Sequence, residues 1–527
     1  MPRAVADAPM FDCKAHFGEL CADSGLSVLS HADIRLAKRS GLKVFVYLDV
    51  PPGYHRALWT RHKSLVAEVA SGSVCDFVRR PCTPPDPPEN EPGYSKGLNE
   101  WLTGAKHAAD VPLLAKLLAL GATPGIHTSD PRKAHLFVVP FLGGFIERVS
   151  PQMSNVLDRE QRSTGRGVVD KLIDHLPHFA NSTSKRHLFL FTNSCGGCLR
   201  QPCHRCASWQ NTHLNRDAGV ELAATLGPTW PVEKIAPHVR PPAGRKWIKQ
   251  LIIPPNVMEA ELHPPLYKPL CMPGADAASA AGPCRPNTAK KELLAFYQGA
   301  HSFNGIRVAV LSELSRVVFG PPSPPPPPGI KAAEIDCRSK PMSCVNTSNG
   351  VAFFYSGSHW HPVTPLGFGA TIEWMRKSKF CICPPGDVPY NKRYFTALLV
   401  GCVPVVFSFR SQIPDERNWW KPKKGPGQRD IDPFYEQINH SELAVEMKVD
   451  VEKDVIGMYD RLRDIPDHVV EAKQRAIERV RHLLLYDLSG SKPDAFTCML
   501  RQVIGMLAAM PQEEGRAALV PPEPFKA

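Results

Sequence analysis

SKFCICPPGD (residues 378–387), followed by RYFTAL (393–398) and GCVPVV (401–406), is the stretch that decides the fold of this chain. The apolar residues 380–383 predict a buried strand, residues 393–400 predict a helix, and residues 403–407 predict the next strand. The Pro-Pro-Gly turn at 384–386 ends the first strand and brings the backbone close to the start of the helix. A strand–loop–helix–strand unit of this kind is typical of parallel α/β sheets.

The start of this helix is a candidate anion site. Its backbone N–H groups and the helix dipole attract negative charge, and Arg393 can add a charge-assisted contact to a diphosphate. Two alternatives stay open from the residues alone: Arg393 can form a salt bridge on the helix, and Asp387 can cap the helix instead of contacting a ligand. Gly401 supplies a residue at which the helix can end.

The alternation of strands and helices continues on both sides of this stretch. Strands are predicted at 42–48, 135–141, 187–191, 248–253, 293–297 and 351–355. Helices are predicted at 110–120, 168–176 and 370–376. The chain also has an apolar, regular segment at 306–314 and a charged helical region at 454–485. A chain of 527 residues is too long for one hydrophobic core. The sequence therefore predicts two α/β domains with parallel sheets.

Shifts in composition set the predicted boundaries. We predict an N-terminal cysteine-containing appendage (1–40), a first Rossmann-like domain (41–257), a linker (258–286), a second Rossmann-like domain (287–510) with a proline-rich insertion (320–329), and a disordered tail (511–527). The 54 prolines gather in loops, so we interpret them as insertions in a folded protein.

The cysteines indicate an oxidising compartment. Six pairs are close neighbours in the sequence, which is typical of disulfides: Cys13/Cys21, Cys75/Cys82, Cys195/Cys198, Cys203/Cys206, Cys271/Cys284 and Cys337/Cys344. Three N-glycosylation sequons, at Asn181, Asn346 and Asn439, point the same way. Three other cysteines lie on or beside predicted strands and are expected to be buried and structural: Cys381, Cys383 and Cys402.

One group of cysteines has a second interpretation. The C-x2-C-x4-C-x2-C spacing could hold zinc through four thiolates: Cys195, Cys198, Cys203 and Cys206. The middle gap is short for a zinc ribbon, so disulfides are favoured and no metal is expected.

The opening stretch resembles the exostosin family, glycosyltransferase family 47, whose pattern is F-C-L-x-P-x-G-D, then R-x-F-D/E-A, then G-C-I/V-P-V. Other pieces follow in the family's order, from about residue 43 to about residue 484. Residues 294–299, LAFYQG, resemble its L-x-F-F-x-G, and Arg307 resembles the arginine that follows. Residues 433–434 with Glu436 resemble its P-F-E.

The resemblance implies an α/β architecture of the GT-B type, in which two Rossmann-like domains face a central cleft and the C-terminal one holds a nucleotide-sugar. It implies inverting transfer of a hexosyl or pentosyl group from that donor, expected to be a UDP-sugar, to a polysaccharide or glycoprotein acceptor. A general base deprotonates the acceptor, and hydrogen-bond donors stabilise the leaving diphosphate. No cofactor is required, and a partner transferase is one candidate partner.

Carried over residue by residue, the resemblance implies donor contacts from Gly299, Arg307, Gly386, Asp387, Arg393, Thr396 and Glu436. The catalytic base stays unassigned, with Asp387, His359 and His361 as candidates. Thr396 departs from the family pattern, which has an acidic residue there; related enzymes use an acid near this point to hold the ribose. A threonine can hydrogen-bond but is not a charged acceptor.

The implied compartment is the Golgi lumen. Residues 1–12 contain no apolar run of signal-peptide length, and no stretch reaches the ~20 apolar residues of a membrane span. Because the cysteines and the sequons agree with each other, we expect that the complete protein is membrane-anchored and that the anchor lies outside this chain.

Three classes of function stay open. An active transferase is the first, and a non-catalytic relative that binds glycan or assists a partner transferase is the second, favoured by Thr396. A cytosolic zinc-binding protein with an α/β core is the third, favoured by the missing signal segment. The net charge of +12 suits anionic partners. Nucleic acid is not expected as a partner, because the chain has no arginine-rich tract interleaved with aromatic residues.

Overall fold

The computed structural model describes residues 28–47, 109–139, 176–179, 186–191, 222–225, 249–252, 254, 291–299, 305–319, 344–346, 350–355, 368–384, 392–409, 433–434, 436–449, 452–487, 490–511 and 516–523. The chain divides into two compact units. The first contains the described residues up to 254 and those from 482 onward, and the second contains the described residues from 291 to 481. Each unit is a mixed α/β structure, as predicted, built on a sheet of mainly parallel strands.

The first unit contains a five-stranded parallel sheet in the order β1-β2-β3-β4-β5. Its strands are β1 (Val44–Val46), β2 (Leu136–Val138), β3 (His187–Phe191), β4 (Leu222–Thr225) and β5 (Lys249–Ile252). All three residues of β2 are buried, as expected for a parallel strand covered on both faces. Four strands confirm the predictions, whereas β4 was missed because the sequence LAAT has little β-propensity.

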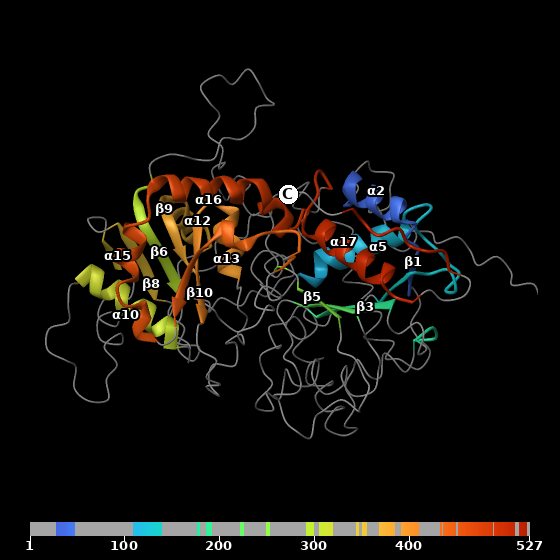
Figure 1. The fold of residues 1–527 in the computed structure, drawn as a ribbon, viewed down its shortest axis with the longest axis horizontal. Coiled ribbons are helices and arrows are strands. Elements are labelled where there is room, and N and C mark those ends of the chain that lie inside the picture. Colours follow the sequence, from blue (N-terminus) through green and yellow to red (C-terminus); the bar gives the residue numbers. More distant parts are fainter. Residues whose placement is uncertain are drawn as a thin grey trace, which may run out of the picture. The chain divides into compact units, whose positions relative to one another are not determined.

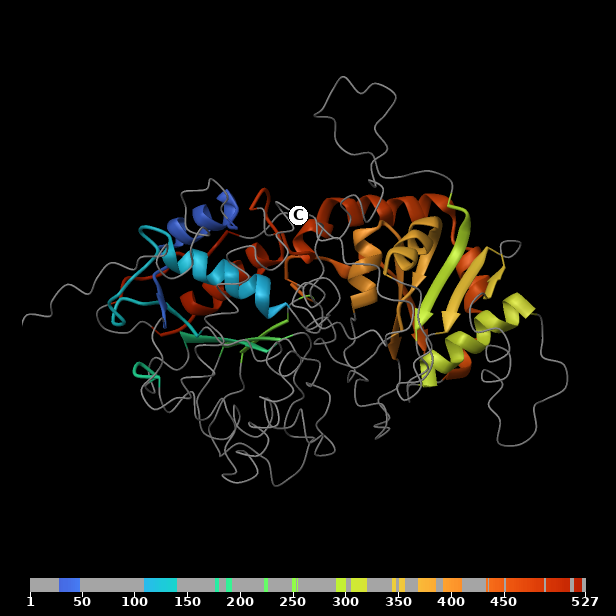
Figure 2. The same ribbon diagram turned by 180° about the vertical axis from the view of Figure 1, so that it is seen from behind.

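Among the described residues, three α-helices belong to this unit: α2 (His31–Ser40), α5 (Asp110–Ala122) and α17 (Ala495–Ala508). Helix α5 contacts β1, β2 and β3, and α17 contacts α2 and β5. Figures 1 and 2 show α5 and α17 side by side over the sheet. Helix α5 was predicted. The C-terminal helix α17 was placed in the second domain by the predicted boundary at 510 and instead belongs to the first unit.

Buried polar and charged contacts explain why the C-terminal helix α17 packs in the first unit. The Lys116 ammonium on α5 lies 3.1 Å from the Asp494 carboxylate, which caps the start of α17, and neither side chain is more than 1% exposed. The Thr497 hydroxyl on α17 donates to Asp33 Oδ1 on α2 at 2.5 Å. Residues 31–40 are therefore part of the first unit rather than an appendage, because their polar groups find partners in segments far away in the sequence.

The expected disordered tail also needs correction. Residues 516–523 run along the first unit: the Ala517 carbonyl lies 2.9 Å from His135 Nε2, and the Val520 N–H donates to the Ser40 carbonyl at 3.1 Å. The composition of the tail predicts disorder, but backbone hydrogen bonds to distant residues fix this part of it.

The second unit contains a six-stranded sheet in the order β11-β10-β9-β6-β8-β7. Its strands are β6 (Leu293–Gly299), β7 (Cys344–Asn346), β8 (Val351–Tyr355), β9 (Ser378–Ile382), β10 (Val403–Phe409) and β11 (Val445–Val449). All neighbours are parallel except β7, which pairs antiparallel with β8. The predicted strands β6, β8, β9 and β10 are confirmed. The edge strands β7 and β11 were missed because they are short or half exposed.

The described helices of this unit are α10 (Gly305–Phe319), α12 (Phe368–Lys377), α13 (Lys392–Leu399), α14 (His440–Leu443), α15 (Met458–Arg463) and α16 (Asp467–Val480), with the 3-10 helix η8 (Glu452–Val455). A second 3-10 helix, η9 (Arg481–Leu484), begins at the last residue of this unit and continues into the first unit. Helix α10 contacts β7 and β8, whereas α13 contacts β10. Figures 1 and 2 show α16 crossing the end of the sheet at which the strands begin. The predicted charged helical region is confirmed, with a break at Pro466, the N-cap of α16.

Candidate functional site

The sheet of the second unit has a topological switch point between β6 and β9. After β6 the chain continues to β7 and β8 on one side, and after β9 it continues to β10 and β11 on the other. In open α/β sheets, ligands bind at the carboxyl ends of the strands where the connections diverge in this way. Gly299 is the last residue of β6, and α13 is the helix that follows β9. The topology therefore brings Gly299 and the start of α13 to the place where a ligand is expected.

Three residues meet at this point. The Arg393 guanidinium lies over the ring of Tyr297, with its central carbon 5.0 Å from the ring centroid. A Cβ atom on Gly299 would lie 2.5 Å from Tyr297 Oη and 2.9 Å from Arg393 Nη2. A side chain at this position would therefore displace the tyrosine hydroxyl and the guanidinium.

Helix α13 adds positive charge of its own to this place. Its first turn contains Lys392 and Arg393 and no acidic residue, and the N–H groups and the dipole of a helix start attract anions. The helix ends as predicted at Gly401, which has a φ of 68°: the Cys402 N–H donates to the Ala397 carbonyl, and the Gly401 N–H donates to the Leu398 carbonyl. The C-terminal end of the helix is thus fixed by the local sequence.

A disulfide between Cys381 and Cys402 closes the segment that contains α13 at its two ends. It joins the end region of β9 to the start of β10, so that the loop after β9 and all of α13 lie within one covalent ring. Burial was expected for these cysteines and is confirmed, but their pairing was not predicted. Cys383 keeps its thiol, and burial raises the pKa of that thiol to about 12, so it stays protonated.

A chain of hydrogen bonds connects α13 to the turn before α14. His440 Nε2 lies 2.8 Å from the Pro433 carbonyl oxygen, which can only accept, so Nε2 carries the hydrogen. Nδ1 then accepts a hydrogen bond from the Tyr394 hydroxyl at 2.9 Å. Burial lowers the pKa of His440 to about 4, which keeps the ring neutral. This network positions the turn that carries Glu436, in which Phe434 has a φ of 57°.

The other predicted donor residues have clear locations. Arg307 lies in the first turn of α10, the helix that follows β6. Glu436 is exposed on its turn. Thr396 is 3% exposed, and its hydroxyl donates to the Lys392 carbonyl at 3.0 Å, so it points into its own helix. Donor contact stays a prediction for all of these residues.

Several predicted residues lie outside the described part of the chain. They are Asp387 and Gly386, the candidate bases His359 and His361, the four clustered cysteines Cys195, Cys198, Cys203 and Cys206, and the sequon Asn181. Asn346 lies on β7. Asn439 is exposed and caps α14, and its Oδ1 accepts a hydrogen bond from the Ser441 hydroxyl at 2.7 Å.

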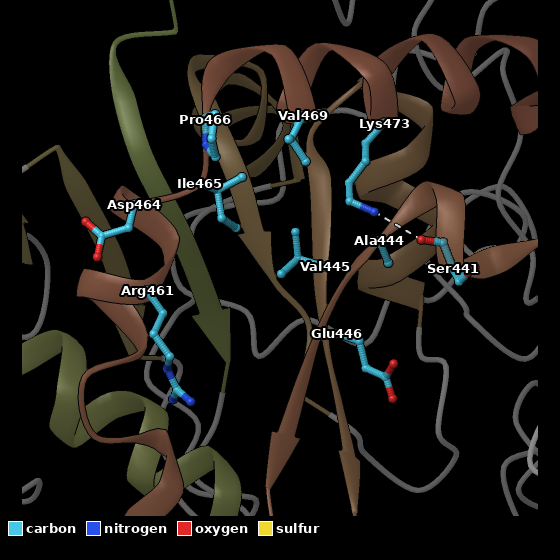
Figure 3. A pocket seen from close by; sticks show the side chains of 10 residues that line it. All are labelled: Ser441, Ala444, Val445, Glu446, Arg461, Asp464, Ile465, Pro466, Val469 and Lys473. Atoms are coloured by element: carbon cyan, nitrogen blue, oxygen red, sulfur yellow. Dashed lines mark hydrogen bonds between the residues drawn. The ribbon is translucent and has the colours of Figure 1, made fainter.

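A separate hollow of about 590 Å³ opens beside β11, lined by residues of α14, α15 and α16 (Figure 3). Val445, Ile465 and Val469 give it an apolar floor. The Lys473 ammonium at its rim donates to the Ser441 carbonyl at 3.0 Å. None of the predicted donor residues lines this hollow.

The described residues contain neither a metal cluster nor a membrane span. No group of three or more histidine, cysteine, aspartate or glutamate side chains in this part of the chain is arranged to hold a metal ion. No helix in the same ranges has both the length and the apolar character needed to cross a membrane.

Sequence reasoning missed two groups at the site, namely Tyr297 and the Tyr394–His440 pair. One signal was present: Tyr297 lies two residues before Gly299 on one strand, so their side-chain positions share a face of the sheet. The Tyr394–His440 contact has no local signal, because 46 residues separate its members.

Comparisons with known proteins agree with the resemblance. The family model of the Exostosin GT47 domain matches residues 38–223 and 329–453, more than half of the chain. A probable glucuronoxylan glucuronosyltransferase of Arabidopsis thaliana is 22% identical over 425 residues, which cover 75% of this chain and 68% of that protein. A probable beta-1,4-xylosyltransferase of the same plant is 27% identical over 156 residues, which cover 29% of this chain and 30% of that protein.

One solved structure, whose title names a putative UDP-N-acetylglucosamine 2-epimerase from Listeria monocytogenes, has 10% sequence identity and a TM-score of 0.31. The match covers 76% of this chain and 92% of that chain. A likeness at this level carries no argument about the arrangement of the two units, and the central cleft stays a prediction.

Proposed function

The chain belongs to the Exostosin GT47 domain family, and from this premise we propose that it is a glycosyltransferase that moves a sugar from a nucleotide-sugar to a polysaccharide or glycoprotein acceptor. The family expected from residues 378–406 is thereby confirmed. The donor, the acceptor and the stereochemistry belong to the proposal.

The observation that carries the proposal is the meeting of Gly299, Tyr297 and Arg393 at the switch point of the sheet. A guanidinium beside the start of a helix suits a diphosphate, because the fork of N–H groups binds two oxygens and the helix dipole adds attraction. Glycine lets the ligand approach the backbone closely. The three residues supply what the diphosphate of a nucleotide-sugar needs.

In the proposed reaction, an oxygen of the acceptor hydroxyl bonds to the anomeric carbon while the bond from that carbon to the diphosphate breaks. Attack from the opposite face inverts the configuration. The hydroxyl proton passes to a general base, for which Asp387, His359 and His361 remain the candidates. The nucleoside diphosphate leaves with an added negative charge, which Arg393 and the start of α13 stabilise.

We also propose that no metal is required. The cationic side chain and helix dipole at the switch point supply positive charge where the leaving group develops negative charge. Activity should therefore persist in EDTA, and complete loss in EDTA with recovery on adding Mn²⁺ would overturn this part of the proposal.

The names of the relatives guide the choice of substrates. Two of them are named as a glucuronoxylan glucuronosyltransferase and a β-1,4-xylosyltransferase. We propose a UDP-sugar as donor and a polysaccharide as acceptor, with a hexosyl or pentosyl group transferred. A partner transferase, as in the sequence-based expectation, is part of the same proposal.

The proposed compartment is the Golgi lumen. The Cys381–Cys402 disulfide favours an oxidising environment, and the exposed Asn439 sequon is accessible to glycosylation. Mass spectrometry of protein from a secretory host should find the disulfide intact and a glycan on Asn439. A reduced Cys381–Cys402 pair in that host would contradict the assignment.

The first experiment is titration of the protein, expressed in a secretory host, with UDP and GDP by calorimetry. Wild type should bind one of them, and Arg393→Ala should weaken binding at least tenfold because a charge-assisted contact is lost. Arg475→Ala is the matched control, since Arg475 is an exposed arginine paired with Glu471 on α16. Transfer from the corresponding nucleotide-sugar to xylan oligosaccharides then tests turnover. If wild type binds neither UDP nor GDP, the proposal is refuted.

Thr396 favours a second candidate, a relative that binds glycan without transferring sugar. Its hydroxyl is committed to the Lys392 carbonyl and is buried, where the family pattern has an acid. If wild type binds no nucleotide and Thr396→Glu restores binding, the chain is a non-catalytic member of the family.

A further inference from the structure

We infer that the Tyr297 hydroxyl is a direct ligand-binding group that donates a hydrogen bond to a diphosphate oxygen of the donor. The inference rests on the proposed function, because it places the diphosphate at the switch point. It adds a neutral donor, absent from the predicted donor residues, beside the cationic Arg393. It also explains an otherwise costly feature of the core.

The first observation is the isolation of this hydroxyl. The Tyr297 side chain is fully buried, and its Oη has no hydrogen-bond partner among the described residues. A buried hydroxyl without a partner costs free energy that the same ring without oxygen would avoid. A ligand oxygen would remove that cost when it binds, so that part of the binding free energy is stored in the unliganded protein.

The second observation is the direction in which the hydroxyl points. Tyr297 Oη lies 2.5 Å from the position of a Cβ on Gly299, the last residue of β6. The hydroxyl therefore points along the strand toward its carboxyl end, where ligands of parallel sheets bind. Because Gly299 has no side chain, this atom is not covered from that end by residue 299.

The third observation is the convergence of two kinds of donor. Arg393 Nη2 lies 2.9 Å from the same Cβ position, so the tyrosine hydroxyl and the guanidinium approach one point from two sides. The central carbon of the guanidinium lies over the tyrosine ring, 5.0 Å from its centroid, and hydrogen bonds to a guanidinium are made by its N–H groups, in its plane. One cationic and one neutral donor near a helix start form a set that suits an anionic oxygen.

The test is Tyr297→Phe, which removes one oxygen atom and keeps the ring under Arg393. Phenylalanine is also the residue that the family pattern has at this position, so the variant is expected to fold. UDP affinity should fall about tenfold, equivalent to about 1.4 kcal/mol, or GDP affinity if GDP is the nucleotide that wild type binds. Affinity for the nucleoside alone should stay unchanged, because it lacks the diphosphate. The melting temperature of the unliganded variant should equal or exceed that of wild type.

Tyr486→Phe is the matched control. The Tyr486 hydroxyl is also buried, but it donates to the Pro254 carbonyl at 2.8 Å in the first unit. Its loss should lower the melting temperature and leave UDP affinity unchanged. Tyr297→Phe should therefore keep or raise the melting temperature and lower UDP affinity. Tyr486→Phe should lower the melting temperature and keep UDP affinity.

The outcomes separate the inference from the proposed function. If wild type binds neither nucleotide, the proposed function fails. If wild type binds and Tyr297→Phe binds equally well, the donor site stands and the inference is wrong. If the variant loses affinity for nucleoside and diphosphate alike, the hydroxyl acts on the shape of the site rather than on the diphosphate, which also overturns the inference.

Discussion

Replacing Gly299 with alanine adds one methyl group where Tyr297 and Arg393 meet. The φ of Gly299 lies outside the left-handed region, so the backbone accepts alanine and the cost comes from contacts alone. The new Cβ would lie 2.5 Å from Tyr297 Oη, and 2.9 Å from both Tyr297 Cζ and Arg393 Nη2. Ordinary contacts of carbon with such atoms are about 3.5 Å, so the tyrosine hydroxyl must move by roughly 1 Å and the guanidinium by roughly 0.6 Å.

The expected magnitude follows from this displacement. Overpacking of a buried site costs about 1–3 kcal/mol, and we expect about 2 kcal/mol because two neighbours must move. In a Tyr297→Phe background the shortest contact disappears while the contact with Cζ remains, so Gly299→Ala should cost about 1 kcal/mol there. UDP affinity should fall more than tenfold in the single variant, since both donors are displaced.

Urea unfolding and calorimetry with UDP measure these effects. Gly505→Ala is the control: Gly505 lies within α17 of the first unit, and apart from its chain neighbours and the backbone of its own helix no atom lies within 4 Å of the position that its new methyl group would take. That variant should gain up to about 1 kcal/mol from helix propensity and keep its UDP affinity. If Gly299→Ala retains both the stability and the UDP affinity of wild type, the packing described at the switch point is wrong.

Three further predictions concern stability. Burial holds the pKa of His440 near 4, below the ordinary value of about 6.5, so the unfolded chain takes up the proton first as the pH falls. Wild type should lose on the order of 3 kcal/mol between pH 6.5 and pH 4 relative to His440→Gln, measured by urea unfolding at each pH. Replacing Cys381 and Cys402 by alanine opens a ring spanning 21 residues and should cost about 3 kcal/mol, with weaker UDP binding because α13 lies inside the ring. Lys116→Met leaves the Asp494 carboxylate buried without its cation and should cost about 3–5 kcal/mol at pH 7.

Each of these has a result that would contradict it. Equal pH dependence of wild type and His440→Gln would mean that the imidazole is not buried as described. Unchanged stability of the double cysteine variant would mean that the bridge does not form in solution. If Lys116→Met is as stable as wild type, Asp494 is protonated or exposed, and the buried pair does not hold α17 to the first unit.

Much of the local structure could be predicted from the sequence. The runs around Phe380 and Val403 are apolar and β-branched, and the segment from Arg393 ends at a glycine, so each element is specified by its own residues. For the same reason, Gly299 at the end of a strand and Arg393 at the start of a helix could be named as candidates. The family pattern is local too, which is why residues 378–406 sufficed to recognise it.

The errors fall where distant segments meet. The boundary at 510 and the separation of residues 31–40 from the first domain were wrong, because Lys116 pairs with Asp494 and Thr497 donates to Asp33 within the first unit. The Cys381–Cys402 bridge was missed because cysteines were paired with close neighbours in the sequence, whereas these two lie 21 positions apart.

The sequence by itself determined the secondary structure of the site, the family, and the residues at the ends of β6 and α13, because these depend on interactions over a few residues. Only the tertiary structure decided that β6 lies between β8 and β9. That strand order creates the switch point and brings Tyr297 under Arg393, although 96 positions separate them in the chain. Strand order depends on how whole sheets and helices pack, and no short stretch of sequence encodes it.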